Sequence, residues 1–264
     1  MSRLRRLAAV LSALAVAASL SSCGGSSGSK GGASSGGAAK VTLKVYAAAS
    51  LTESFGEIKK SYEAAHPNVE IVYTFAGSQD LVGQLSNGAS ADVLATADEP
   101  TMEKAAKEGL TGEQRKFASN TLVLITPKGN PAGVKGLDSS LGGAKLVICA
   151  KKEKVPCGTA THKLAQKLGV TLKPVSEEQK VTDVRGKVEA GEADAGIVYR
   201  TDAVASGKKV DTIEIPGADQ IVNTYPIAPV KASEHAAEAK EFVDYVMSAE
   251  GQKSLKKYGF GSVK

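Results

Sequence analysis

Strand-like and helix-like segments alternate over residues 40–264, and this alternation restricts the fold more than any other feature of the sequence. Short β-rich runs separate stretches whose apolar residues recur at helical spacing. We expect strands at 41–46, 69–75, 92–96, 121–126, 145–150 and 195–199, and helices at 80–86, 99–108, 159–168, 182–190, 236–247 and 251–257. Repeated βα units imply largely parallel sheets with helices on their faces, so the sequence predicts an α/β protein.

The first helix has the clearest start signal. The sequence Ser50-Leu51-Thr52-Glu53 is typical of a capping box, and it precedes Phe55, Ile58 and Tyr62 at helical spacing. We expect this helix to begin at Ser50, to bury that apolar face and to end near Pro67.

Two long extended stretches, near 120–126 and 224–230, join the βα units into two groups. We therefore predict two lobes, residues 40–123 with 226–264 and residues 124–225, connected by two crossing strands. In open α/β sheets, ligands bind beyond the carboxyl ends of the strands. We expect the ligand site in the cleft between the lobes.

The start of the chain reads as an export leader. A basic start, Met1–Arg6, precedes an apolar, alanine-rich run at 7–20 that is short for a membrane span, so residues 1–22 are predicted to be a signal peptide. The sequence Leu20-Ser21-Ser22-Cys23 resembles a bacterial lipobox, which makes Cys23 the predicted lipid attachment site. An ordinary secretory signal with a chance cysteine is the alternative.

Residues 23–39 consist mainly of Gly and Ser, and no apolar pattern is present to order them. We expect this segment to be a flexible tether between the lipidated cysteine and the folded domain. The predicted location is the extracytoplasmic face of the cell membrane, held by acyl chains rather than by a transmembrane helix.

Composition excludes two classes of function. The formal net charge of +5 falls to +2 without Arg3, Arg5 and Arg6 of the leader, because 30 basic residues then face 28 acidic ones. That balance gives no basis for nucleic-acid binding. The sequence has no Trp, so a carbohydrate cleft built on stacked indoles is not expected.

Two strand-to-helix turns share one design. The strand at 41–46 runs through Ala47-Ala48-Ala49 to Ser50, and the strand at 69–75 runs through Ala76-Gly77 to Ser78. Each turn combines small residues, a hydroxyl and the N–H groups of a helix start, which attract an anion and let it approach the backbone. The pair indicates an oxyanion site without a cation. That both serines are plain helix N-caps is the alternative.

A series of short motifs gives these turns a family context. In order along the chain they are Ala47-Ala48-Ala49-Ser50-Leu51-Thr52, Phe75-Ala76-Gly77-Ser78, Ala91-Asp92-Val93, Val155-Pro156-Cys157-Gly158, Asp183-Val184-Arg185-Gly186, Gly196-Ile197-Val198-Tyr199 and Lys257-Tyr258-Gly259-Phe260. Over about residues 41–262 the sequence resembles the periplasmic molybdate-binding proteins of ABC importers, the ModA family. The resemblance implies the type II periplasmic-binding fold, in which each lobe is a mostly parallel sheet flanked by helices and two crossover strands form the hinge.

The resemblance also implies a set of anion ligands. Ser50 and Ser78 would each offer a hydroxyl and a backbone N–H from the first lobe. The backbone N–H groups of Cys157 and Val184 and the hydroxyl of Tyr199 would come from the second lobe. The family often has alanine at the position of Cys157. Because this position contributes its backbone N–H, the different side chain should leave the contact with the anion intact. Val184 as a plain core residue and Tyr199 as a satisfied buried phenol are the alternatives.

The function implied by the resemblance is the capture of molybdate, and of tungstate, for delivery to an ABC permease in the membrane. The protein would be a monomer without a cofactor, and its metal would be held as an oxyanion without direct side-chain coordination. A carrier of sulfate or phosphate is the nearest alternative. A lipid-anchored enzyme and an adhesion or sensory lipoprotein are the alternatives from other classes.

Enzyme chemistry has little support in the sequence. Cys157 and His162 could imitate a thiol nucleophile and its base, but no third orienting group is evident. The G-x-S-x-G match at 24–28 lies in the tether, where the strand and helix that such a motif needs cannot form. The scattered histidines, His66, His162 and His235, do not form a zinc motif. For Arg185, beside the predicted site, we expect a structural salt bridge.

The remaining cysteines predict a disulfide. If Cys23 is lipidated, Cys149 and Cys157 are the only other cysteines of an exported protein, and paired cysteines in an oxidising compartment are usually bridged. The intervening polar loop is long enough to turn back. Two reduced thiols, with Cys149 buried, are the alternative.

Overall fold

The computed structural model describes residues 40–263. The predicted signal peptide at 1–22, the lipidation site Cys23 and the tether at 23–39 lie outside the described residues and stay predictions. The described residues all belong to one compact unit. No helix within residues 40–263 is long and apolar enough to span a membrane.

Strands of the first lobe form a five-stranded sheet in the order β2-β1-β3-β10-β4. Its members are β1 (Val41–Ala48), β2 (Val69–Ala76), β3 (Val93–Ala95), β4 (Arg115–Asn120) and β10 (Asn223–Pro229). β1 pairs in parallel with β2 and β3, whereas β10 runs antiparallel to β3 and β4.

Strands of the second lobe form another five-stranded sheet in the order β7-β6-β8-β5-β9. Its members are β5 (Leu122–Pro127), β6 (Leu146–Cys149), β7 (Ser176–Glu178), β8 (Ala195–Tyr199) and β9 (Val210–Ile213). β6 pairs in parallel with β7 and β8, and β5 runs antiparallel to β8 and β9. Both sheets are therefore mixed, because β10 in the first sheet and β5 in the second run against their neighbours.

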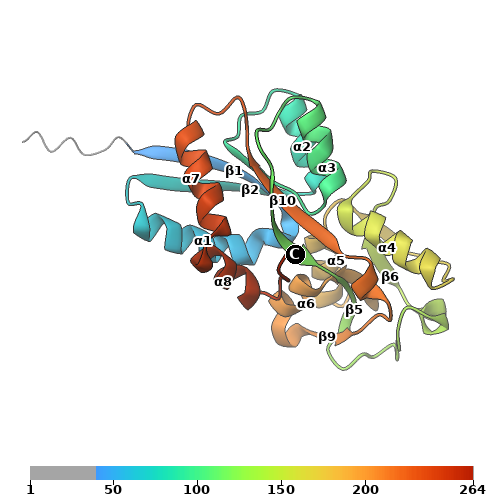
Figure 1. Ribbon diagram of the computed structural model, residues 1–264. Coiled ribbons are helices and arrows are strands. Elements are labelled where there is room, and N and C mark those ends of the chain that lie inside the picture. Colours follow the sequence, from blue (N-terminus) through green and yellow to red (C-terminus); the bar gives the residue numbers. More distant parts are fainter. Residues whose placement is uncertain (1–39, 264) are drawn as a thin grey trace, which may run out of the picture. The chain divides into compact units, whose positions relative to one another are not determined.

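Helices cover both sheets (Figure 1). The first lobe carries α1 (Thr52–Ala65), α2 (Ser78–Ser86), α3 (Glu99–Lys107), α7 (Ala236–Met247) and α8 (Ala249–Lys257). The second carries α4 (Pro156–Lys167), α5 (Val181–Glu189) and α6 (Arg200–Ser206). Short 3-10 helices are η1 (Ala49–Leu51), η2 (Ser139–Gly143), η3 (Gly207–Lys209) and η4 (Ala218–Gln220).

The predicted two-lobed α/β architecture is thus confirmed, with one sheet in each lobe. The chain passes from the first sheet to the second at Thr121, between β4 and β5, and it returns to the first sheet in β10. The predicted lobe division after residues 123 and 225 stays a prediction, since strand pairing alone does not mark where a rigid lobe ends.

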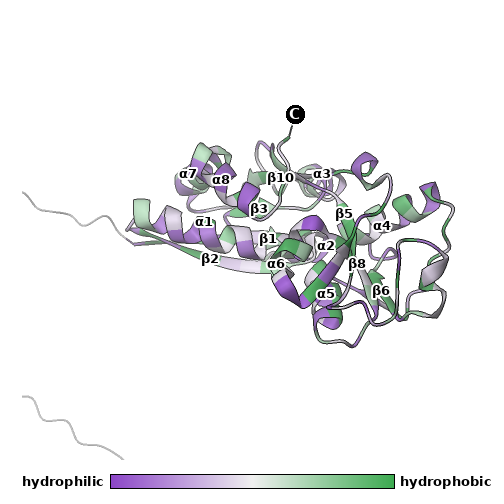
Figure 2. Ribbon diagram, turned by 90° about the horizontal axis from the view of Figure 1, so that it is seen from below, coloured by the Kyte–Doolittle hydropathy of each residue, from purple (hydrophilic) through white to green (hydrophobic). Residues whose placement is uncertain are grey.

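The core follows the predicted apolar faces. Phe55, Ile58 and Tyr62 of α1 are fully buried, and the rings of Phe55 and Tyr62 meet Phe242 of α7 edge to face. Figure 2 shows hydrophobic residues concentrated in β5, β6 and β8 of the second sheet, with hydrophilic residues on the helices around them. This segregation is the hydrophobic pattern from which the fold was predicted.

The predicted capping box at Ser50 is wrong. Ser50 lies in η1, α1 begins at Thr52, and no described side chain caps its N-terminus at Leu51. The Ser50 hydroxyl instead bonds to the Tyr225 hydroxyl of β10 at 2.9 Å. A 3-10 turn separates β1 from α1, and the side chains of Ser50 and Glu53 have partners in other elements, Tyr225 and Arg185.

Candidate functional site

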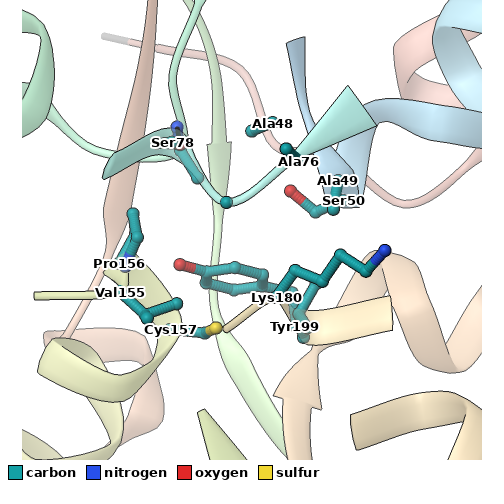
Figure 3. Close-up of a pocket in the computed structure, with 13 residues that line it drawn as sticks. Ala48, Ala49, Ser50, Ala76, Ser78, Val155, Pro156, Cys157, Lys180 and Tyr199 are labelled. Atoms are coloured by element: carbon teal, nitrogen blue, oxygen red, sulfur yellow. Dashed lines mark hydrogen bonds between the residues drawn. The ribbon is translucent and has the colours of Figure 1, made fainter. Parts of the chain in front are cut away.

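A small pocket lies where the two lobes meet (Figure 3). It is lined by turns that follow parallel strands and by the helices that begin there: Ala48, Ala49, Ser50, Ala76, Gly77, Ser78, Ala97, Val155, Pro156, Cys157, Lys180, Val181 and Tyr199. Four of the five predicted ligand residues, Ser50, Ser78, Cys157 and Tyr199, are brought together in it. Figure 3 shows the two serines on one side and Cys157, Tyr199 and Lys180 on the other.

Helix starts converge on this pocket from both lobes. α2 begins at Ser78, α4 at Pro156 and α5 at Val181, and the 3-10 helix η1 begins at Ala49. The first N–H groups of a helix have no acceptor within that helix, and they carry the positive end of its dipole. Because the lining on the first-lobe side consists of Ala, Gly and Ser, a small anion can approach the N–H groups there closely.

The Ser78 hydroxyl is oriented by its partner. Its oxygen accepts a hydrogen bond from the backbone N–H of Ala97 at 3.0 Å, and the carbonyl of Ala97 accepts one from the Asn223 side chain at 3.0 Å. An oxygen that already accepts from an amide still has its own O–H to donate. The Ser78 hydrogen is therefore available to a ligand in the pocket.

The Ser50 hydroxyl belongs to a buried polar network. It bonds to the Tyr225 hydroxyl at 2.9 Å, and the Asn120 amide lies 3.4 Å from that hydroxyl and donates to Thr201 at 2.8 Å. Burial raises the pKa of Tyr225, so its phenol stays protonated. Such a network fixes the Ser50 side chain at the pocket edge.

Tyr199 ends β8 and carries an unmatched donor. Its side chain is 1% exposed, and its hydroxyl has no hydrogen-bond partner among residues 40–263. Burial raises the pKa of the phenol well above its ordinary value, so the hydroxyl keeps its proton. A buried donor without an acceptor costs about 1–3 kcal/mol, which a bound anion would recover. The assignment of Tyr199 as a ligand stays a prediction.

Val184 lies one turn along α5 from the pocket. It is fully buried, and it is not among the described residues that line the pocket, where α5 is represented by Lys180 and Val181. Its assignment as a ligand stays a prediction. Lys180 and Val181 were missed from the sequence, because the helix was expected to start one residue later, at Thr182.

Lys180 is the one formally charged side chain among the described residues of the lining. Lys180 is the N-cap residue of α5, its Nζ lies 3.6 Å from Asp183 in the first turn of that helix, and both side chains are more than a third exposed. The charge therefore lies at the mouth, partly screened by water.

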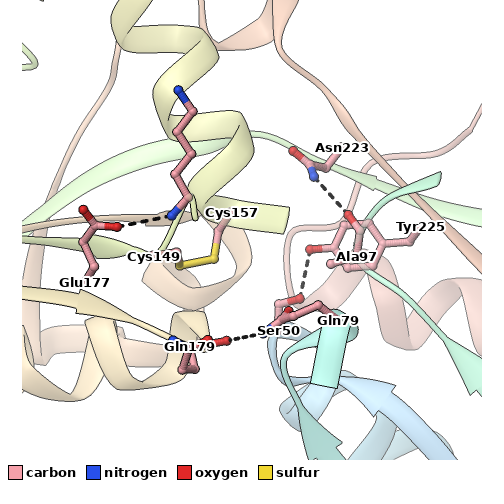
Figure 4. Close-up of a disulfide and its surroundings, with 10 residues drawn as sticks. Ser50, Gln79, Ala97, Cys149, Cys157, Glu177, Gln179, Asn223 and Tyr225 are labelled. Atoms are coloured by element: carbon pink, nitrogen blue, oxygen red, sulfur yellow. Dashed lines mark hydrogen bonds between the residues drawn. A yellow bond between two sulfur atoms is a disulfide. The ribbon is translucent and has the colours of Figure 1, made fainter. Parts of the chain in front are cut away.

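The predicted disulfide is present in the structure. Cys149 ends β6 and Cys157 lies in the first turn of α4, with their Cα atoms 5.7 Å apart (Figure 4). The next residue must be small, because a Cβ at Gly158 would lie 2.4 Å from the carbonyl oxygen of Ala150. A cysteine held in a disulfide cannot be a thiol nucleophile, so the pairing of Cys157 with His162 as catalytic groups is wrong.

Arg185 makes the structural salt bridge that was predicted. Its guanidinium lies 2.8 Å from the carboxylate of Glu53 on α1, in the other lobe. Within residues 40–263, no cluster of three or more His, Cys, Asp or Glu is placed to hold a metal ion.

Comparison with known proteins agrees with this geometry. Residues 43–261 match the family model described as bacterial extracellular solute-binding protein. The molybdate-binding protein ModA of Mycobacterium tuberculosis strain H37Rv is 42% identical over 83% of this chain and 84% of its own length. ModA of Escherichia coli K12 is 34% identical over 83% and 88%. The periplasmic molybdate-binding protein of Azotobacter vinelandii superposes with a TM-score of 0.75 at 20% identity, covering 84% of this chain and all of that one.

Proposed function

The chain belongs to the bacterial extracellular solute-binding protein family as a ModA-type member, and on this premise we propose that it captures molybdate and delivers it to an ABC importer. It is a binding protein and not an enzyme. We further propose that Ser50, Ser78, Cys157, Val184 and Tyr199 supply the donors that hold the anion.

The observation that carries the proposal is the donor Tyr199, which lacks an acceptor and is buried where helix starts from both lobes converge. A site built for a cation would not collect N–H and O–H donors around its centre. A dianion loses its hydration shell on entry, and charge-assisted hydrogen bonds replace that shell. Affinity then depends on every donor pointing at an oxygen.

Fixed donors also give selectivity by size. Sulfate is smaller than molybdate, so donors spaced for the larger tetrahedral oxyanion would meet sulfate at poor distances, and hydrogen bonds weaken steeply with poor geometry. Tungstate has nearly the size of molybdate. We therefore propose that tungstate is bound as well.

The protein is proposed to work outside the cytoplasm as a lipoprotein anchored through Cys23. The basis is the Leu20-Ser21-Ser22-Cys23 sequence and the Gly/Ser-rich segment after it. A monomer on a tether of this kind could meet the permease while staying at the membrane surface. Mass spectrometry of the amino-terminal peptide tests this part, because a diacylated Cys23 is expected and an unmodified one contradicts it.

Titration calorimetry tests the ligand. Molybdate and tungstate should bind, whereas sulfate and phosphate should bind at least about a hundredfold more weakly. Ser78→Ala should weaken molybdate binding by ~1.5–3 kcal/mol, the range for a hydrogen bond to a charged group. Tight binding of sulfate or phosphate without molybdate would assign another oxyanion. No heat with any of the four would favour a function other than transport.

A further inference from the structure

The two lobes are joined beside the pocket by the ion pair of Glu53 and Arg185. We propose that this pair is a clasp that holds the lobes closed on the bound anion and so sets how slowly the anion leaves. The inference rests on the proposed function. Glu53 and Arg185 are positioning residues, since neither is among the described residues that line the pocket.

The position of the clasp supports this role. Glu53 is in the first turn of α1, three residues after Ser50, and Arg185 is one turn after Val181 on α5. The clasp therefore links the turn that carries a proposed ligand in one lobe to the helix whose start lines the pocket from the other. Any separation of the two pocket walls must first break the 2.8 Å contact between them.

The surroundings of Arg185 make the contact reversible. Its guanidinium also lies 3.6 Å from Glu189 and 3.9 Å from Asp202, and both carboxylates belong to the same lobe as Arg185. When the lobes separate, Arg185 keeps these two partners and Glu53 becomes hydrated. An ion pair whose removal strands a buried charge is costly to break. Here neither charge is stranded, so the clasp can open on each transport cycle.

Partial burial gives the clasp a measurable strength. The side chain of Arg185 is 16% exposed and that of Glu53 is 30% exposed, so water screens the pair less than it screens a surface pair. Burial lowers the pKa of Arg185, but the carboxylates of Glu53, Asp202 and Glu189 outweigh it and hold that pKa above its ordinary value.

A second contact between the lobes lies next to Ser78. The side-chain amide of Gln79 donates to the backbone carbonyl of Gln179, 3.1 Å away (Figure 4). It is a neutral contact, and it remains in any variant of the clasp. Loss of the clasp should therefore weaken closure without abolishing it.

The test uses Glu53→Gln with Glu57→Gln as the matched control. Glu57 lies one turn further along α1, and its ion pair with Lys257 of α8 stays within the first lobe. Tyrosine fluorescence in a stopped-flow instrument would give association and dissociation rate constants for molybdate. For Glu53→Gln we expect dissociation to be roughly fivefold faster with association changed less than about twofold, since contacts made after encounter act on dissociation. Glu57→Gln should match the wild type.

A purely structural role for Glu53 would lower thermal stability in both glutamine variants and leave the two rate constants unchanged, which would overturn the proposal. Arg185→Gln is a weaker test, because it removes the partner of buried Asp202 and could prevent folding. If the wild type did not bind molybdate at all, the proposed function would fail, but the clasp would still be tested on the dissociation of whichever of tungstate, sulfate or phosphate gives heat in calorimetry. Faster dissociation of that anion from Glu53→Gln than from Glu57→Gln supports the clasp, and equal dissociation rates contradict it.

Discussion

At the scale of single residues, the hydroxyl of Tyr199 is expected to affect molybdate affinity and protein stability in opposite directions. Because this hydroxyl is buried without a partner in the described part of the chain, it should destabilise the unliganded protein and stabilise the complex with the anion. We expect Tyr199→Phe to weaken molybdate binding by ~1.5–3 kcal/mol while leaving the free energy of unfolding of the unliganded protein unchanged or higher. Calorimetry and urea unfolding of the same samples measure the two effects.

Tyr62 provides the control for this prediction. It is also fully buried, its hydroxyl also lacks a hydrogen-bond partner among residues 40–263, and it lies in α1 among aromatic rings away from the pocket. Tyr62→Phe should therefore have the same effect on unfolding and no effect on molybdate affinity. If both variants bind molybdate like the wild type, Tyr199 is not a ligand.

Asp202 gives a prediction on pH. It is 1% exposed, and desolvation raises its pKa from its ordinary value of 3.8 to about 7, with Arg185 opposing the shift and Glu53 adding to it. Tyr199 and Tyr225 also face it, and both phenols stay neutral. A raised carboxyl pKa means that the folded state binds the proton more tightly than the unfolded state does, so this group lowers stability as pH rises.

The pH range of this effect lies between the two pKa values of Asp202, 3.8 in the unfolded chain and about 7 in the folded protein. The contribution of Asp202 to stability should decline from about pH 4 and reach its lowest level above about pH 7. Asp202→Asn removes this titration, so the stability of the wild type relative to Asp202→Asn should fall across that range. Urea unfolding at pH 5 and pH 8 measures it. A constant difference between the two proteins would contradict the assignment.

Single residues also show where sequence reasoning ends. Ser50 and Ser78 were found from a local pattern of small residues, a hydroxyl and a helix start, and the structure places both in the pocket. The α5 residues were harder, because which N–H groups face a ligand depends on the residue at which a helix begins. Pattern reasoning fixes that point only to within a few residues.

At the scale of elements, the strands and helices with strong apolar periodicity were predicted, and the short polar ones were not. β7 is a three-residue strand at a sheet edge, and α6 has seven residues and follows β8 without a loop. β4 and β9 were missed as well. The pairing of β4, β7 and β9 depends on strands far away in the sequence, so the local spacing of apolar residues does not predict it. The antiparallel pairs of each sheet arise in the same way, from the crossing strands.

The disulfide acts on one element, the start of α4. By tying Cys157 to the end of β6, it fixes the turn of Val155, Pro156 and Cys157 that lines the pocket. Cys149→Ala with Cys157→Ala should lower the free energy of unfolding by ~2–3 kcal/mol through the loss of loop closure. It should also weaken molybdate binding, because the turn must then be ordered on binding.

Reduction provides the control for the disulfide. A reductant should lower the stability and affinity of the wild type to the level of the double variant, and it should leave the double variant unchanged. Urea unfolding and calorimetry with and without reductant measure this. A reductant effect of equal size in both proteins would show that the bridge is not its cause.

At the scale of the whole molecule, binding and closure are proposed to be one event, since the proposed donors come from both lobes. In the structure the lobes are in contact beside the pocket through the Glu53–Arg185 ion pair and the Gln79–Gln179 hydrogen bond. A ligand can shift an open–closed equilibrium only by as much as it prefers one state. Donors from the second lobe that reach the anion only after closure would supply that preference, and the permease could then distinguish loaded from empty protein.

Gly77 allows closure to be tested separately from the donors. It precedes α2 with φ −58° and ψ 137°, a conformation open to any residue, so Ala should fit the first lobe without strain. A Cβ there would lie 2.4 Å from the Gln79 amide nitrogen and 2.5 Å from the carbonyl oxygen of Gln179 in the second lobe. The Gln79 side chain can rotate away, but the Gln179 main chain can move only if the lobes stay further apart.

We therefore expect Gly77→Ala to weaken molybdate binding by roughly tenfold or more, because the new Cβ would clash with Gln179 only in the closed state. It should also reduce the compaction that small-angle scattering detects on adding molybdate, and leave the unfolding of the unliganded protein unchanged. Gly83 of α2 is the control, because no other described atom would lie within 4 Å of a Cβ there. Gly83→Ala should raise stability by about 0.5–1 kcal/mol as a better helix former and bind molybdate normally. Normal affinity and full compaction in Gly77→Ala would mean that the approach of Gln179 to Gly77 is not required in the loaded state.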